Sequence, residues 1–239
     1  MSGWSYWDWK GFFYPEKLKS TDWLSFYAQT YHTTEINSSF YHLPKAKTVE
    51  GWGKKVPDGF TFCPKMSRYL THIQKLKNPA EPLLRFFDVF DSIKNQLGPV
   101  LIQLPPSLKF DTRLVKDFFE ILKDTYSGYV FALEARHETW LAREAIDLLE
   151  EYNIVWVISQ SGVGYPYLEA VTASHIYFRF HGPGKLYASS YTDEQLSAYA
   201  KKFAKWAKDG HTVWVYFNNT MHGIALKNAD LLRNMLDVT

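Results

Sequence analysis

Short apolar runs alternate with longer amphipathic segments along most of the chain, and this alternation constrains the fold more than any other feature. Runs of roughly 4–8 residues that are apolar throughout, or at every second position, are typical of strands, whereas apolar residues three and four apart are typical of helices. Strands that alternate with helices predict βαβ units and a parallel sheet. The expected strands are residues 33–38, 60–65, 99–104, 130–136, 154–160, 176–181 and 212–218.

The segments between the expected strands have helical spacing and residues that suit helix ends. Ser20 and Asp111 suit N-caps, while Gly98 and Gly210 lie where helices commonly end. The expected helices are residues 21–30, 47–56, 82–97, 111–126, 139–152, 193–208 and 222–236.

Seven strands are one short of a closed eight-stranded barrel. Residues 2–6 are the remaining candidate for the first strand, which would then be short or truncated. The length of 239 residues suits a fold that usually needs about 250. The sequence therefore predicts an α/β protein, a (β/α)₈ or TIM barrel, in a single domain over residues 1–239.

Composition excludes several classes of protein. A net charge of +2 is too small for a protein that coats nucleic acid non-specifically. The single cysteine, Cys63, allows no internal disulfide, which is typical of a reducing compartment. No apolar run reaches the about 18 residues that span a bilayer, and residues 1–6 do not resemble a signal peptide. We therefore expect a cytoplasmic protein without a membrane partner; nothing here indicates its oligomeric state.

Side chains within each expected strand divide between two faces, because successive residues point in opposite directions. Phe178 and Phe180 share one face of their strand, whereas Arg179 and His181 share the other. In a barrel the apolar face packs under the helices and the other face points inward. The polar members of the inward set fall at the C-terminal ends of the strands, where this fold builds its sites.

Eight short motifs are distributed along nearly the whole chain: SGWSYWDW (2–9), FYP (13–15), EINSSFY (35–41), RYLTH (68–72), GPVLIQLPP (98–106), EARH (134–137), HG (181–182) and YFNN (216–219). In their residues and their order these motifs resemble the YecE-like family, which is known as a domain of unknown function. The resemblance implies a TIM barrel and no established activity. The chain departs from the family pattern in beginning almost at its first motif and in having Cys63 and Pro64 before the retained Lys65.

The expected site is the barrel mouth, where polar side chains from several strands converge. Glu134 and Arg136 form either a structural ion pair or part of a working site. Glu35 and Lys65 present the same choice, while Gln103 is more typical of an amide that bonds backbone groups. The expected members are Glu35, Asn37, Lys65, Gln103, Glu134, Arg136, Arg179, His181 and Asn218.

Charge at the mouth favours an anionic ligand. Two carboxylates face Lys65, Arg136 and Arg179, and guanidinium groups suit phosphate or carboxylate. Trp4 and Tyr6 could stack a sugar or base above them. The basic groups would oppose a metal, and the chain has neither a His-Glu-x-x-His motif nor paired cysteines. We therefore expect no metal and no cofactor.

Two functional hypotheses remain open. The first is a hydrolase or isomerase acting on a phosphorylated or nucleotide-like anionic substrate. Glu35 or Glu134 would act as general acid or base, and His181 would transfer a proton near neutral pH. The second is a protein that binds nucleic acid or a phosphorylated metabolite without turnover.

Overall fold

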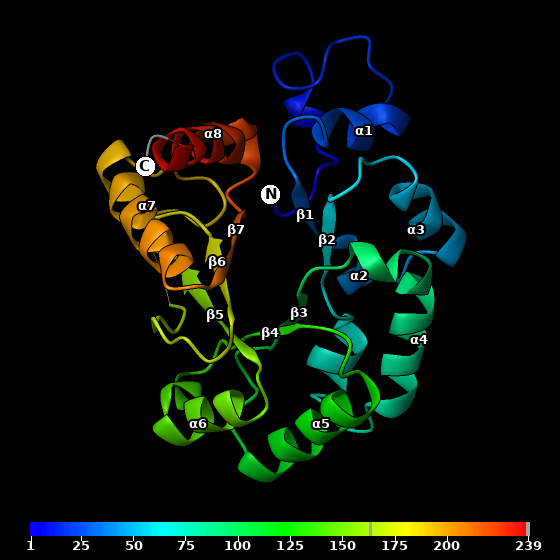
Figure 1. Cartoon of the computed structure of the whole chain (residues 1–239), viewed down its shortest axis with the longest axis vertical. Helices are drawn as coiled ribbons and strands as arrows, with labels where there is room; N and C mark the ends of the chain where they lie inside the picture. Colours follow the sequence, from blue (N-terminus) through cyan, green and yellow to red (C-terminus); the bar gives the residue numbers. More distant parts are fainter. Residues whose placement is uncertain (163, 238–239) are drawn as a thin grey trace.

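The computed structural model describes residues 1–162 and 164–237, and their paired strands all run parallel. It has an α/β fold in which helices surround the strands (Figure 1). All seven expected strands are present. A two-stranded sheet joins β1 (Thr33–Ile36) to β2 (Thr61–Pro64), and a second sheet has the order β3 (Val100–Gln103), β4 (Phe131–Glu134), β5 (Val155–Gln160), β6 (His175–Phe180) and β7 (Thr212–Phe217).

The two sheets meet between β2 and β3. Single parallel bridges pair Phe62 with Leu97 and Lys65 with Leu101. The amide of Met66 also donates to the carbonyl of Leu101 at 2.8 Å. These contacts align the C-terminal end of β2 with β3, and so place Lys65 beside β3, the edge strand of the longer sheet.

The N-terminal segment lies between β7 and β1 (Figure 1). The amide of Ser2 donates to the carbonyl of Phe217 at 3.1 Å, and the amide of Glu35 donates to the carbonyl of Met1 at 2.9 Å. The strand expected over residues 2–6 is wrong: this described segment contains no strand. Gly3 has φ of +109°, and the chain turns there toward the 3₁₀ helix η1 (Trp7–Trp9).

The helices follow the expected segments, with some divisions. Asp111 is confirmed as an N-cap, because its carboxylate accepts from the amide of Leu114 at 2.9 Å. The helix expected over 82–97 divides at Asp91 into α4 (Ala80–Phe90) and the 3₁₀ helix η4 (Asp91–Gln96). The α-helices are α1 (Trp23–Tyr27), α2 (Ser38–Tyr41), α3 (Ala46–Gly53), α4 (Ala80–Phe90), α5 (Thr112–Thr125), α6 (Arg143–Glu151), α7 (Asp193–Lys208) and α8 (Ile224–Asp237). The remaining helical turns are η2 (Ser20–Asp22), the π-helical η3 (Tyr69–Ile73), η4 (Asp91–Gln96), η5 (Glu138–Leu141) and η6 (Met221–Gly223).

The two faces of the strands pack into different apolar clusters, as the alternation predicts. Phe178 lies in the larger cluster, where its ring contacts Tyr199 and Phe203 of α7. Tyr177 and Tyr216 belong instead to a smaller cluster on the opposite face. Burial of one such ring contributes roughly 1.5–3 kcal/mol, so the alternation fixes which side of each strand faces the helices.

None of the described helices is long and apolar enough to cross a membrane.

Candidate functional site

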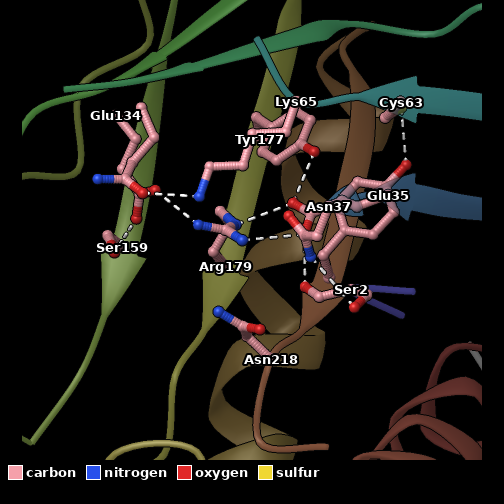
Figure 2. A network of polar contacts seen from close by, with 12 residues as sticks. Ser2, Glu35, Asn37, Cys63, Lys65, Glu134, Ser159, Tyr177, Arg179 and Asn218 are labelled. Atoms are coloured by element: carbon pink, nitrogen blue, oxygen red, sulfur yellow. Dashed lines mark hydrogen bonds and ion pairs between the residues drawn. The ribbon is translucent and has the colours of Figure 1, made fainter. Parts of the chain in front are cut away.

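A buried guanidinium joins two carboxylates at the ends of three strands. Arg179 on β6 donates to Glu35 on β1 through Nε (2.8 Å) and Nη2 (2.9 Å), and to Glu134 on β4 through Nη1 (2.6 Å). Figure 2 shows Arg179 between the two glutamates. Arg179 is only 1% exposed and both glutamates are fully buried. Its fork geometry binds one carboxylate with two nitrogens and still reaches the other.

Each oxygen of the two carboxylates accepts at least one hydrogen bond. Glu35 accepts from Tyr177 (2.8 Å) and Ser2, and Glu134 accepts from Ser159 (2.6 Å). Burial alone would raise the pKa of each glutamate. The guanidinium charges and these hydrogen bonds outweigh burial and hold the pKa of Glu35 below its usual value and that of Glu134 well below it. Both side chains are therefore anionic ligands of arginine at neutral pH.

His181 is a neutral imidazole bound at both nitrogens. Nε2 lies 3.1 Å from Glu134 Oε1, and Nδ1 lies 3.0 Å from Asn218 Nδ2. This arrangement assigns the proton to Nε2, which donates to Glu134, and makes Nδ1 the acceptor. Burial lowers the pKa of His181 to about 4, even though Glu134 opposes the shift. The geometry therefore does not favour the expected proton transfer by His181 near neutral pH.

Arg136 extends the network on the other side of Glu134. Its Nη2 lies 2.8 Å from Glu134 Oε1, and the ring of Tyr165 lies 3.4 Å from the guanidinium carbon. The second terminal nitrogen, Nη1, is buried and has no hydrogen-bond partner among the described residues. A buried guanidinium nitrogen without a partner is unfavourable, so Arg136 retains capacity for one more acceptor.

Lys65, just after β2, is a cation of a different kind. Its Nζ donates to Gln103 Oε1 at 2.7 Å and lies 4.1 Å from the centre of the Phe40 ring. Among the described residues no carboxylate forms an ion pair with it. Burial, and then the positive charge of Arg179, lower the pKa of Lys65 to about 7. Two carboxylates balance two guanidiniums in this cluster, so Lys65 supplies the charge that remains.

Two neighbouring cavities open beside this network. One has a volume of about 300 Å³ and is lined by Tyr6, Asn37, Tyr41, Lys65, Arg179, Tyr187, Asn218 and Thr220. The other has about 420 Å³ and includes Trp4, Tyr6, Glu35, Asn37 and Trp52 in its wall. Because Tyr6 and Asn37 line both, the two cavities adjoin at these side chains. Asn37 Oδ1 is buried there without a hydrogen-bond partner among the described residues.

The expected residues therefore come together, but some pairings differ from expectation. The pairing considered for Glu35 with Lys65 is wrong, because Glu35 binds Arg179 with both oxygens. Gln103 was expected to bond backbone groups, and one half of its amide does so. Its Nε2 donates to the carbonyl of Leu104 at 3.0 Å, while its Oε1 accepts from Lys65. Trp4 packs edge-on against Trp52, with ring centres 5.3 Å apart, and lines the larger cavity.

Several partners of the network were not expected. Tyr177 lies two residues before Arg179 on the same strand face, so the period-two pattern could have identified it. Ser159 is aligned with Arg179 between β5 and β6, which only the strand register reveals. Tyr165 and Tyr187 come from loops, where no periodic pattern marks them.

Within residues 1–162 and 164–237, no group of three or more His, Cys, Asp or Glu side chains is placed to hold a metal ion. Arg179 lies between Glu35 and Glu134, where a divalent cation would have to displace it. Cys63 is a free thiol, and burial raises its pKa to about 12. Its sulfur accepts a hydrogen bond from Tyr216 at 2.9 Å. This environment is that of an unreactive core thiol.

Comparison with known proteins assigns the chain to a family. Residues 1–239 match the family described as "Protein of unknown function DUF72". The chain belongs to the DUF72 family. Curated relatives include the UPF0759 protein YunF of Bacillus subtilis (strain 168), with 25% identity over 94% of this chain and 90% of YunF. The UPF0759 protein YecE of Escherichia coli O157:H7 is 24% identical over 62% of this chain and 52% of YecE. The resemblance to the YecE-like family is thereby confirmed.

Solved DUF72 structures share this fold. A DUF72 protein from Thermotoga maritima MSB8 has a TM-score of 0.86 and 28% identity, over 99% of this chain and 97% of that one. A DUF72 protein from Enterococcus faecalis V583 has a TM-score of 0.80 and 21% identity, over 90% and 88% of the two chains. Membership of DUF72 names no reaction, so a function has to be argued from the site.

Proposed function

We propose that this DUF72 protein is an enzyme, a hydrolase or isomerase, that acts on a phosphorylated or nucleotide-like anionic substrate bound beside Lys65. The observation that supports this best is the charge of Lys65, which faces the smaller cavity without a carboxylate partner among the described residues. A bound anion would supply the missing negative charge. Arg136 does not line this cavity, but its charge acts on Lys65 and its unpartnered Nη1 remains available as a second donor.

Lys65 is also the group best placed to move protons. A pKa of about 7 lets its amine accept or release a proton at neutral pH, which is the requirement for a general base. The expected acid–base residues Glu35 and Glu134 are occupied by arginine. Their depressed pKa values make them weak bases.

Aromatic side chains beside the anion site favour an organic substrate over a bare inorganic ion. Tyr6, Tyr41 and Tyr187 line the smaller cavity, and Tyr41 is 71% exposed. The adjoining cavity adds the indole of Trp4. Such rings can stack a sugar or a base whose phosphate lies near Lys65.

Calorimetric titration with sulfate tests the anion site, because the charge of sulfate is constant between pH 6 and 9. We expect affinity to fall as pH rises through about 7, where Lys65 loses its proton. Lys65→Gln should weaken binding by roughly 1.5–3 kcal/mol, about tenfold to a hundredfold, since a charged hydrogen bond is removed. Arg136→Ala should weaken it over the same range.

The matched control is Lys205→Gln, at the end of α7 and paired with Asp209 at the surface. It should bind sulfate as the unmodified protein does. Equal binding by Lys65→Gln, or no binding by the unmodified protein, contradicts the anion site.

A panel of phosphorylated compounds then separates the two functional hypotheses, the enzyme and the non-catalytic binding protein. Turnover of any compound favours the enzyme. Saturable binding of a mononucleotide or single-stranded oligonucleotide without product favours the non-catalytic alternative.

We also propose that residues 1–239 form one domain with a (β/α)₈ barrel, in which residues 1–2 take the place of the first strand. Two backbone hydrogen bonds support this, because they join Ser2 to β7 and Met1 to β1. Two bridges between β2 and β3 support the other junction. A cytoplasmic location is proposed from the single thiol, which needs no oxidising compartment.

A further inference from the structure

We propose that Lys65 is an amine nucleophile that forms an imine with an aldehyde or ketone carbon of the anionic substrate. This inference rests on the proposed function for the anionic group of the substrate. It goes further in naming a covalent step, the residue that performs it and the carbonyl compounds that qualify.

The position of Lys65 favours a chemical role over a structural ion pair. The side chain lines a cavity of about 300 Å³, large enough for a small organic molecule. Gln103 Oε1 and the ring of Phe40 orient Nζ without neutralising it. By contrast, Lys54 and Lys205 pair with carboxylates four residues away on exposed helix surfaces.

The surroundings of Lys65 also supply neutral amine at physiological pH. Burial and the nearby Arg179 charge lower its pKa to about 7, so about half of the amines are unprotonated at pH 7. An ordinary lysine, with a pKa of about 10.4, has about a thousand times less neutral amine at that pH. Desolvation beside another cation is an established way to activate lysine for imine formation.

The carboxylates do not cancel this effect, because arginine already binds them. Glu35 is held by two nitrogens of Arg179, and Glu134 by one nitrogen each of Arg179 and Arg136. The paired network therefore fixes a guanidinium next to Lys65 and withholds the carboxylates from its ammonium.

The step balances without an external oxidant or reductant. The lone pair of the Lys65 amine attacks the carbonyl carbon, a C–N bond forms, and the C=O π electrons move to oxygen. That oxygen receives the two amine protons and leaves as water when the nitrogen lone pair forms the second C–N bond and the C–O bond breaks. One proton taken from solvent then converts the imine to an iminium. Tyr187 lines the same cavity, and burial raises the pKa of its hydroxyl to about 12. It therefore stays protonated and can relay protons.

The substrate class follows from charge and size. The iminium carries one positive charge and Arg179 lines the same cavity, so the cavity attracts an anionic group once the covalent bond has formed. A small phosphorylated aldehyde or ketone meets both requirements. An iminium withdraws electrons from the adjacent carbon, which assists proton removal or carbon–carbon cleavage there.

Pyridoxal 5′-phosphate is a suitable probe, because it combines an aldehyde with a phosphate. The intact protein is incubated with it at pH 7 and reduced with borohydride, and the modified peptides are identified by mass spectrometry. We expect the label mainly on Lys65, with labelling that rises with pH through about 7 and decreases when inorganic phosphate is added. Lys65→Arg keeps a positive charge but removes the amine nucleophile, so it should lose this label. Lys205→Arg should leave Lys65 labelling unchanged.

Labels spread over surface lysines with Lys65 unmodified would overturn the imine. Titration with inorganic phosphate and labelling with uncharged pyridoxal separate the two proposals. Phosphate binding with Lys65 unmodified rejects the imine and leaves the anion site intact. Modification of Lys65 by pyridoxal without phosphate binding supports the amine and rejects the anion site.

Discussion

The chemical character of the polar residues depends on which partners they meet. Burial lowers the pKa of both His181 and Lys65 below the usual value for each side chain. His181 is saturated by Glu134 and Asn218, whereas Lys65 has a neutral amide and a cavity. The neutral imidazole of His181 has both nitrogens bonded, whereas the amine of Lys65 still faces a cavity.

The buried state of His181 predicts a pH dependence of stability. Its pKa is about 4 in the folded protein and near 6.5 when unfolded. Between these values the unfolded chain binds more protons, so stability is lost as pH falls from about 6.5 to 4. Each pKa unit is worth about 1.4 kcal/mol, which makes this loss on the order of 3 kcal/mol.

Denaturant unfolding of His181→Gln at several pH values checks this. Gln can still donate to Glu134, and the variant should lose much less stability over that window than the unmodified protein. His32→Gln, a change at an exposed histidine, should retain the full slope. Parallel pH profiles for His181→Gln and the unmodified protein would show that His181 is not the group responsible.

At the scale of elements, the sequence predicts where the strands lie better than it predicts which strands are joined by ion pairs. All seven strands were predictable, because period-two alternation separates the Phe178 face from the Arg179 face. The polar cluster was predictable because its members lie near the C-terminal ends of strands, on the face opposite the apolar side chains that pack under the helices. The Glu35–Arg179 pairing was not, since it depends on how β1 and β6, which belong to different sheets, lie relative to one another. The loop tyrosines lack any periodic signal.

The ion-pair network predicts strong coupling between β1 and β6. Glu35→Gln and Arg179→Met should each cost about 3–5 kcal/mol, because each leaves a buried charge or donor without its partner. The double variant should cost at least about 1 kcal/mol less than the sum. Chemical denaturation of all four proteins measures this coupling. The control is the surface pair Lys205 and Asp209, replaced by Gln and Asn, whose coupling free energy should be less than about 1 kcal/mol. Losses of stability that simply add for the Glu35 and Arg179 variants would contradict the network.

At the scale of the whole molecule, side chains of β7 contact the first two strands. The hydroxyl of Tyr216 lies 2.6 Å from that of Thr33 on β1 and 2.9 Å from the Cys63 sulfur on β2. A Cβ on Gly98 would lie 2.7 Å from that sulfur and 3.0 Å from the ring of Trp214 on β7. Only glycine fits there, because side chains from β2 and β7 converge on the start of β3. This convergence favours a closed interior over an open sheet.

Closure through residues 1–2 has a consequence for hydrogen exchange. If these residues complete the barrel, the amides of Ser2 and Glu35 are bonded as strand amides are, to Phe217 and Met1. Their exchange should then be slowed to within about tenfold of the amide of Phe178 in β6, because opening them requires opening the barrel. Native-state exchange followed by NMR gives each rate, with the exposed turn amide of Gly59 as the fast reference. If Ser2 and Glu35 exchange as fast as Gly59 while Phe178 stays protected, β1 and β7 are free edges and the barrel is open.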